Sequence, residues 1–326
     1  MKQSVLVLGA HGFIGRYVVT TLARSDFATP ILGLRHPASG ETRPNALEER
    51  RVDAVRVESI LPALAGVGCV VNCVAGDRRT LVESARAIVE AARQSEQPVR
   101  IVHLSTLSVY GSTVGLVDES SALRADLGPY SQAKAAAEAL MAAYPRSVVL
   151  RPGCVFGPGS EQWTTRYARL LTANRLGDLG AAGDGQCNLV HVADVAQAVL
   201  CAVRIAQADG RSFNLAIPEI LTWNDFMSRF AIALGAVPVR RLGGRRLKIE
   251  TKLLAPPLKI MEILGSKLGV RGLPPPIPPS LLRLMAQDIR LDAQRAQSEL
   301  GVRFTGVDQM LTEAAHWYRQ QVASRQ

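Results

Sequence analysis

A tyrosine and a lysine stand four residues apart in the segment GPYSQAKAAAE at 128–138, and together they could transfer a proton. On a helix this spacing places Tyr130 and Lys134 on the same face, one turn apart. An unperturbed tyrosine hydroxyl has a pKa of about 10, and a neighbouring ammonium lowers that pKa because it favours the phenolate. The pair therefore predicts a site of general acid–base chemistry.

The lysine is unusual in this chain. Only six of the 38 basic residues are lysines, and between Lys2 and Lys248 every basic residue except Lys134 is an arginine. A compact ammonium and a planar guanidinium are not interchangeable. We infer that this position requires an ammonium, although a surface pair on an alanine-rich helix is the plainer alternative.

A glycine-rich segment near the N-terminus predicts a dinucleotide-binding loop. In GAHGFIG, the residues Gly9, Gly12 and Gly15 directly follow the apolar run VLVL and open a helix-like segment. Glycines at such a turn let the backbone approach a pyrophosphate, whose charge the helix N-terminus then stabilises. The position favours dinucleotide binding over an ordinary structural turn.

The end of the second predicted strand indicates which nicotinamide cofactor is bound. An acidic side chain there binds the ribose hydroxyls of NAD, whereas an arginine can pair with the 2′-phosphate of NADP. The segment LGLRHP carries Arg35, followed by His36, and no acidic residue lies nearby. We expect NADP, with NAD as the alternative, since Arg35 could also be an ordinary surface residue.

Strand-like and helix-like segments alternate over the first two hundred residues. The strand-like segments are SVLVLG, PILGLR, CVVNCVAG, VRIVHLS and SVVLRPG, and the helix-like ones are IGRYVVTTLARS, SILPALAG, TLVESARAIVEAARQ and PYSQAKAAAEALMAAY. This alternation predicts an α/β fold with a Rossmann-like, doubly wound parallel sheet. The pattern returns briefly at VHVADVAQAVLCAV, and the run PPPIPPS at 274–280 predicts an extended connector.

Composition and charge exclude several classes of protein. The 326 residues contain neither a signal-like N-terminus nor a run approaching the roughly 20 apolar residues of a membrane span. The five cysteines lack ligand or disulfide spacing, which favours free thiols in a cytoplasmic protein and no metal site. The net charge of +10 is concentrated in residues 237–290, with eleven basic and three acidic residues. That segment lacks base-stacking aromatic residues, so we expect no nucleic-acid partner.

Seven motifs together resemble the extended short-chain dehydrogenase/reductases, in the group known as the NAD-dependent epimerase/dehydratase family. They occur in family order over roughly residues 1–205, as GAHGFIG, VDA, NCVAG, LSTLSVYG, YSQAK, LRPGCVFGPG and VHVADVAQA. The resemblance implies an NAD(P)-binding Rossmann domain at residues 1–152, to which 187–215 return. It also implies a smaller C-terminal substrate-binding lobe, formed by residues 153–186 and 216–326.

The resemblance also implies the residues of the site. The catalytic set is Thr106, Tyr130 and Lys134, in which Lys134 also binds the nicotinamide ribose. The implied cofactor-binding residues are Gly9, Gly12, Phe13, Ile14, Gly15, Arg35, Asp53, Ala54, Ala75, Tyr130 and Lys134. Asp53 corresponds to the acid beside the adenine, and the His191/Asp194 motif is expected to position the second lobe.

Departures from the family pattern narrow the expected reaction. Sugar dehydratases carry an Asp-Glu pair directly after the threonine, whereas Leu107 and Ser108 follow here. Nucleotide-sugar epimerases usually have asparagine at the position of Cys154, and Arg151-Pro152 instead resembles the hydroxysteroid dehydrogenases and dihydroflavonol reductases.

We therefore expect an NAD(P)-dependent oxidoreductase that interconverts a carbonyl and a secondary alcohol on a small-molecule substrate, which could be steroid- or lipid-like. A nucleotide-sugar epimerase and a catalytically silent binding or assembly subunit are the alternatives.

The basic segment at 252–273, KLLAPPLKIMEILGSKLGVRGL, mixes lysines with large apolar residues. A cationic amphipathic stretch can bind an anionic bilayer, and each basic residue near the surface contributes about 1 kcal/mol. A helical cap over the substrate pocket is the alternative. The sequence thus leaves open a peripheral contact with the inner face of a membrane, and it leaves open a homodimer.

Overall fold

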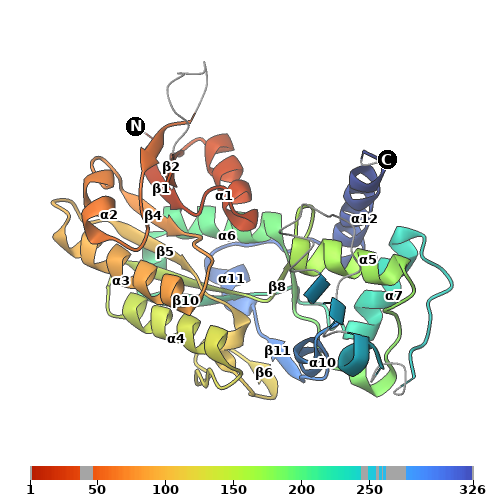
Figure 1. Cartoon of the computed structure of the whole chain (residues 1–326). Coiled ribbons are helices and arrows are strands. Elements are labelled where there is room, and N and C mark those ends of the chain that lie inside the picture. Colours follow the sequence, from red (N-terminus) through yellow and green to blue (C-terminus); the bar gives the residue numbers. More distant parts are fainter. Residues whose placement is uncertain are drawn as a thin grey trace.

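The computed structural model describes residues 2–36, 47–243, 249–254, 257–258, 260–261 and 277–324. Its larger part is a seven-stranded parallel sheet, and a second lobe made mainly of helices lies beside it (Figure 1). The strand order is β10 (Arg211–Leu215), β7 (Ser147–Pro152), β5 (Arg100–Leu104), β4 (Cys69–Asn72), β1 (Gln3–Leu8), β2 (Ala28–Leu34) and β3 (Glu49–Arg51). The predicted doubly wound α/β fold is confirmed.

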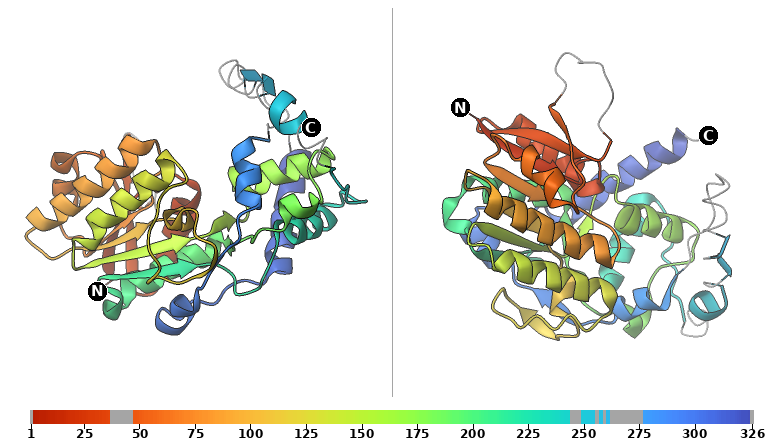
Figure 2. Two further views of the ribbon diagram at one scale, coloured as in Figure 1. Left: turned by 90° about the horizontal axis from the view of Figure 1, so that it is seen from below. Right: turned by 60° about the vertical axis from the view of Figure 1, so that its left-hand side comes forward.

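Helices cover both faces of this sheet, as the short apolar strands require. One face carries α2 (Val57–Ala63), α3 (Arg78–Gln94) and α4 (Pro129–Ala142), of which α3 and α4 lie side by side (Figure 2). The other face carries α1 (Phe13–Arg24) and α6 (Val192–Arg204). The chain order reverses between β1 and β4, which is where doubly wound sheets bind their ligands, at the carboxyl ends of the strands.

The second lobe has an apolar core of its own. Its helices are the π-helical turn η2 (Glu161–Thr165), α5 (Arg166–Thr172), η3 (Gly180–Gly183), α7 (Trp223–Leu234), η5 (Ile249–Leu254), α10 (Pro279–Met285) and α12 (Val307–Ala323). Within it, Tyr167 and Trp223 stack with ring centroids 5.8 Å apart, and Phe226 packs edge-on against both rings. Such aromatic packing stabilises the interior of the lobe.

Short elements connect the lobe to the sheet. β8 (Cys154–Phe156) pairs with β9 (Leu189–His191), and β6 (Gly115–Val117) pairs with β11 (Ile289–Leu291). The single-turn helices η1 (Leu107–Tyr110) and η4 (Ala206–Ala208) follow β5 and α6.

The C-terminal segment returns to the sheet. After β11, the helix α11 (Gln294–Glu299) brings Ala296, Leu300 and Val302 into the same apolar cluster as α1 and α6. The division proposed from the sequence, with 216–326 in the lobe, did not anticipate this return. The predicted connector at 274–280 is wrong over its last two residues, because Pro279 begins α10 at a position where proline is tolerated. Residues 274–276 lie outside the described residues.

Candidate functional site

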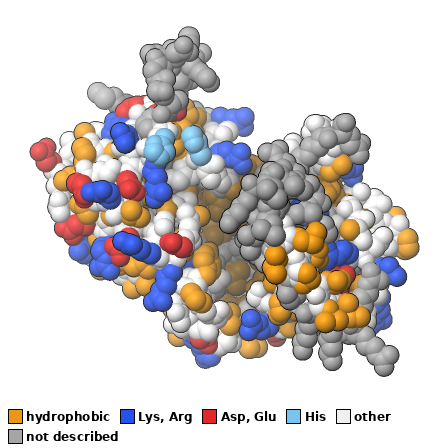
Figure 3. Space-filling view, viewed as in Figure 1, with side chains coloured by type: hydrophobic (Ala, Val, Ile, Leu, Met, Phe, Trp, Pro, Cys, Tyr) orange, Lys and Arg blue, Asp and Glu red, His pale blue; other side chains and the backbone are white. Residues whose placement is uncertain are grey.

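A cavity of about 640 Å³ opens at the carboxyl edge of the sheet, against the second lobe. Figure 3 shows the surface hollowed between these two parts of the molecule. The structure brings seven of the predicted site residues to its wall: Gly12, Phe13, Ile14, Ala75, Thr106, Tyr130 and Lys134. The remaining five, Gly9, Gly15, Arg35, Asp53 and Ala54, do not line it.

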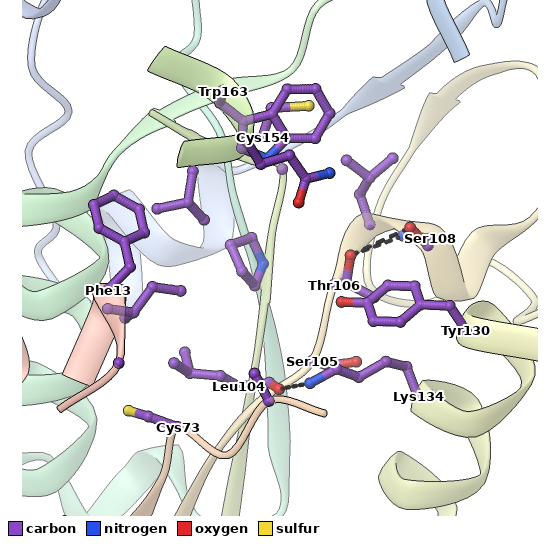
Figure 4. A pocket seen from close by; sticks show the side chains of 18 of the residues that line it. Phe13, Cys73, Leu104, Ser105, Thr106, Ser108, Tyr130, Lys134, Cys154 and Trp163 are labelled. Atoms are coloured by element: carbon purple, nitrogen blue, oxygen red, sulfur yellow. Dashed lines mark hydrogen bonds between the residues drawn. The ribbon is translucent and has the colours of Figure 1, made fainter. Parts of the chain in front are cut away.

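Two neighbouring elements bring the three predicted catalytic side chains together. Thr106 follows the end of β5, while Tyr130 and Lys134 lie on successive turns of α4. The Tyr130 hydroxyl points toward Thr106 (Figure 4), although the residue as a whole is 51% exposed. Lys134 is only 7% exposed, and its Nζ donates a hydrogen bond of 2.7 Å to the Leu104 carbonyl oxygen.

The protonation of Tyr130 differs from the prediction. Burial of its hydroxyl raises the pKa of Tyr130, and a hydrogen bond with Thr106 opposes this rise. The predicted lowering of this pKa by Lys134 is wrong for this structure, in which burial outweighs the effect that lowers it. Burial also lowers the pKa of Lys134 to about 8. The Tyr130 hydroxyl is therefore protonated at physiological pH, and the Lys134 side chain is mostly charged at pH 7.

The glycine loop has the close packing that a dinucleotide cradle requires. Gly9 has φ +77°, and a Cβ there would lie 2.6 Å from the Cys73 carbonyl oxygen. A Cβ on Gly15 would collide with the Gly9 carbonyl. Gly12 caps α1 without a side-chain hydrogen bond, so the first N–H groups of this helix are left for an anion at the cavity wall. The loop fits a pyrophosphate on these grounds.

Arg35 and Asp53 form an ion pair. In the sequence analysis they were predicted to contact different parts of the cofactor. Arg35 Nε lies 3.5 Å from Asp53 Oδ1, and the two side chains are 61% and 37% exposed. Such an exposed pair contributes little to stability. A bound phosphate or ribose could therefore replace either partner of this ion pair at a small cost in free energy.

Several residues of the cavity wall were not found from the sequence. Cys73 follows β4, Trp163 comes from η2, and Leu284 comes from α10. No local pattern marks Trp163 and Leu284, because two distant segments of the second lobe bring them to the cavity. The buried Glu138, which does not line the cavity, was also missed, although it continues the four-residue spacing from Lys134 along α4.

His191 and Asp194 lie outside the cavity wall. Asp194 accepts hydrogen bonds of 2.8 Å from the backbone N–H and the hydroxyl of Thr305. His191 Nε2 lies 3.6 Å from Glu313 Oε2 on α12. His191 at the end of β9 and Asp194 on α6 thus both contact the C-terminal segment, a structural arrangement that fits the expected positioning role.

Known proteins share both the sequence pattern and the fold. A sequence profile of the NAD dependent epimerase/dehydratase family matches residues 5–216. A ceramide reductase of Caulobacter vibrioides is 26% identical over 72% of this chain and 71% of its own length. A 2-alkyl-3-oxoalkanoate reductase of Stenotrophomonas maltophilia is 26% identical over 88% of this chain and 89% of its own.

A solved structure adds the fold comparison. The UDP-glucuronic acid 4-epimerase of Bacillus cereus, in complex with UDP-glucuronic acid and NAD, superposes with a TM-score of 0.73 at 17% identity. The match covers 98% of this chain and all of that one. Reductases and epimerases, the two reaction types left open by the sequence, thus both occur among the similar proteins. The profile match over most of the chain, on a sheet that carries the glycine loop and the Tyr130/Lys134 helix, shows that the chain belongs to the NAD-dependent epimerase/dehydratase family.

Proposed function

We propose that this protein reduces a ketone on an apolar, lipid-like substrate. The composition of the cavity wall carries this proposal: among the described residues that line it, Lys134 is the only cation and Glu161 the only acid. A nucleotide-sugar would bring a diphosphate, for which proteins normally supply basic partners or helix N-termini. The second lobe presents Trp163 and Leu284 instead, which suit an apolar substrate.

The chain's own residues would carry the proton and hold the reactants. The neutral Tyr130 hydroxyl donates its proton to the substrate oxygen, and the Thr106 hydroxyl donates a hydrogen bond to the same oxygen. The α1 N-terminus at Gly12 holds the cofactor pyrophosphate, and Lys134 holds the nicotinamide ribose. The bound nicotinamide cofactor supplies the hydride.

The names of two of the relatives agree with this substrate class. Ceramide and 2-alkyl-3-oxoalkanoate, which appear in the names of two reductases, both carry alkyl chains. We include the domain division in the proposal, with 1–152 and 187–215 binding the cofactor and 153–186 and 216–326 contributing the substrate lobe. The segment around α11 is the exception, since it packs on the sheet.

A paired substrate assay tests the proposed function. Initial rates of NADPH and NADH oxidation are measured with a 2-alkyl-3-oxoalkanoate and, separately, with UDP-glucose. We expect net oxidation with the keto acid only. Conversion of UDP-glucose without net cofactor oxidation would instead support an epimerase, and cofactor binding without any turnover would support a silent subunit.

The preference for NADP should depend on Arg35. Replacing it by aspartate (Arg35→Asp) should weaken NADPH binding roughly tenfold or more relative to NADH, because a charged partner of the 2′-phosphate is lost. Fluorescence titration of both cofactors measures the change. Arg86→Asp is the matched control, since Arg86 is also an exposed arginine paired with an acid, Glu83. Equal affinity of the unmodified protein for the two cofactors would contradict a phosphate role for Arg35.

We propose that the basic segment at 252–273 binds an anionic membrane surface. Most of residues 252–273 lie outside the described residues, but five apolar side chains beside or within this stretch are exposed: Ile249, Leu253, Leu254, Ile260 and Met261. The one acid described there, Glu250, is buried and paired with Arg175. Exposed apolar side chains in a strongly basic segment match an anionic bilayer. Among the described helices, none is long and apolar enough to cross a membrane.

This proposal predicts salt-sensitive cosedimentation with anionic liposomes. Replacing Lys252, Lys259 and Lys267 by glutamine should weaken binding, because each charge near the surface contributes about 1 kcal/mol. Zwitterionic liposomes, which carry no net charge, are the control and should bind little protein. If the unmodified protein stays in the supernatant with anionic liposomes at low ionic strength, the segment is not a membrane-binding surface.

A further inference from the structure

A buried carboxylate lies directly behind the candidate catalytic residues. Glu138 follows Lys134 by one turn of α4, is 3% exposed and does not line the cavity. Its Oε2 accepts a hydrogen bond of 2.7 Å from the Ser105 hydroxyl. Its Oε1 accepts hydrogen bonds from Nε, at 2.8 Å, and Nη2 of Arg151. Both carboxylate oxygens are therefore occupied inside the protein.

These contacts join α4 to the end of β5. Lys134 Nζ holds the Leu104 carbonyl at 2.7 Å, and Glu138 holds the hydroxyl of the next residue, Ser105. The residue after that is Thr106, whose hydroxyl faces Tyr130 (Figure 4). Thr106 and Tyr130 come from different elements, so the contacts between β5 and α4 set how their hydroxyls lie relative to each other.

Arg151 keeps the carboxylate in one orientation. Its Nη1 donates to the Tyr110 hydroxyl at 2.8 Å and to the Glu119 carbonyl at 3.2 Å, and its guanidinium lies over the Tyr110 ring. The Tyr110 hydroxyl donates in turn to Asn214 Oδ1 at 2.7 Å. A buried ion pair is weak support for stability, but a fully hydrogen-bonded one can fix a specific geometry.

We propose that Glu138 is a positioning residue that locks the end of β5 onto α4 and thereby sets the relation between the Thr106 and Tyr130 hydroxyls. This inference deepens the proposed function and rests on it for its kinetic part. Glu138 touches neither the cavity nor the reacting atoms, so it acts through Ser105 and through its charge.

The charge of Glu138 also acts on Lys134. Burial lowers the pKa of Lys134 to about 8, while the negative charge of Glu138 favours the ammonium. The other titratable groups that face Lys134 are neutral at physiological pH, because burial raises the pKa of Cys73 to about 12 and lowers that of His103 to about 3. Loss of the Glu138 charge should therefore move the titration of Lys134 to lower pH.

Three variants separate these two effects. Glu138→Gln keeps the shape and hydrogen-bonding reach of the side chain but removes its charge. Glu138→Asp keeps the charge but shortens the side chain. Ser105→Ala removes the hydrogen bond to Glu138 and leaves the ion pair of Glu138 with Arg151 intact. We expect Glu138→Asp and Ser105→Ala to lower kcat about tenfold with little change in KM, since small misplacements of reacting groups are costly. Glu83→Gln, which neutralises an exposed glutamate paired with Arg86, should change nothing.

A spectroscopic titration follows the charge effect without any turnover. With only six lysines in the chain, ¹³C-lysine NMR resolves few signals, and Lys134→Arg identifies that of Lys134. The midpoint should fall in Glu138→Gln and stay in place in Ser105→Ala. An unchanged midpoint in Glu138→Gln would overturn the charge effect.

Crystal structures of the unmodified protein and of Ser105→Ala test the positioning effect, also without any turnover. We expect the Thr106 side chain to move relative to the Tyr130 hydroxyl. An unmoved Thr106, or a wild-type kcat in both Ser105→Ala and Glu138→Asp, would overturn the proposal. If the unmodified protein reduces no ketone at all, the proposed function fails, and the NMR and crystallographic results still decide the role of Glu138. Ser105→Ala also keeps the test open if the Glu138 variants do not fold.

Discussion

Replacing Tyr130 by phenylalanine is expected to lower the ketone-reduction rate by about a thousandfold while leaving cofactor affinity nearly unchanged. Only the hydroxyl that faces Thr106 is lost, and a positioned proton donor contributes about 10²–10⁴-fold to such reactions. Steady-state kinetics give the rate, and fluorescence titration of NADPH gives the affinity. The ring remains, so the cavity wall keeps its shape.

Tyr318→Phe is the matched control for this variant. Tyr318 lies on α12, outside the cavity wall, and losing its hydroxyl should leave turnover intact. If Tyr130→Phe keeps more than a few per cent of the wild-type rate, Tyr130 is not the proton donor.

Replacing Lys134 by arginine is expected to reduce kcat about a hundredfold, even though the charge is kept. The ammonium occupies a buried position and donates to the Leu104 carbonyl, where a larger, planar guanidinium has no matching room. Reduction rates of Lys134→Arg and of the unmodified protein, measured across a range of pH, separate the effect of side-chain shape from the effect of charge. Near-normal activity in this variant would show that the position does not require a lysine.

The pH dependence of the wild-type rate has a defined sign. Because burial lowers the pKa of Lys134 to about 8, the ammonium is present below that pH and is lost above it. The reduction rate should therefore be level through neutral pH and fall above about pH 8. In Lys134→Arg the residual rate should lack this fall, because a guanidinium stays protonated.

Local patterns in the sequence were sufficient for the sheet and for part of the site. Short apolar runs that end in glycine or polar residues marked the strands closely, as SVVLRPG did for β7 (Ser147–Pro152). The four-residue spacing placed Tyr130 and Lys134 on one helix face, and both line the same cavity. These features depend on neighbouring residues, so periodicity reveals them.

Features that depend on distant contacts were not predictable. Trp163 and Leu284 both line the cavity although more than a hundred residues separate them, and β11 pairs with β6 across an even longer stretch of chain. The partner of Lys134 was also missed, because a backbone carbonyl such as that of Leu104 leaves no trace in the residue types. The raised pKa of Tyr130 follows from burial, which only the packed structure defines.

Isotope transfer tests the central claim most directly. NADPH that carries deuterium at the transferable position of its nicotinamide ring is incubated with the protein and a 2-alkyl-3-oxoalkanoate, and the product is examined by mass spectrometry and NMR. We predict one deuterium on the carbon that bears the new hydroxyl group, with matching oxidation of the cofactor, and formation of this product about a thousandfold more slowly by Tyr130→Phe. Absence of deuterium from the keto acid, together with inversion of a nucleotide-sugar without net cofactor oxidation, would contradict the proposed ketone reduction.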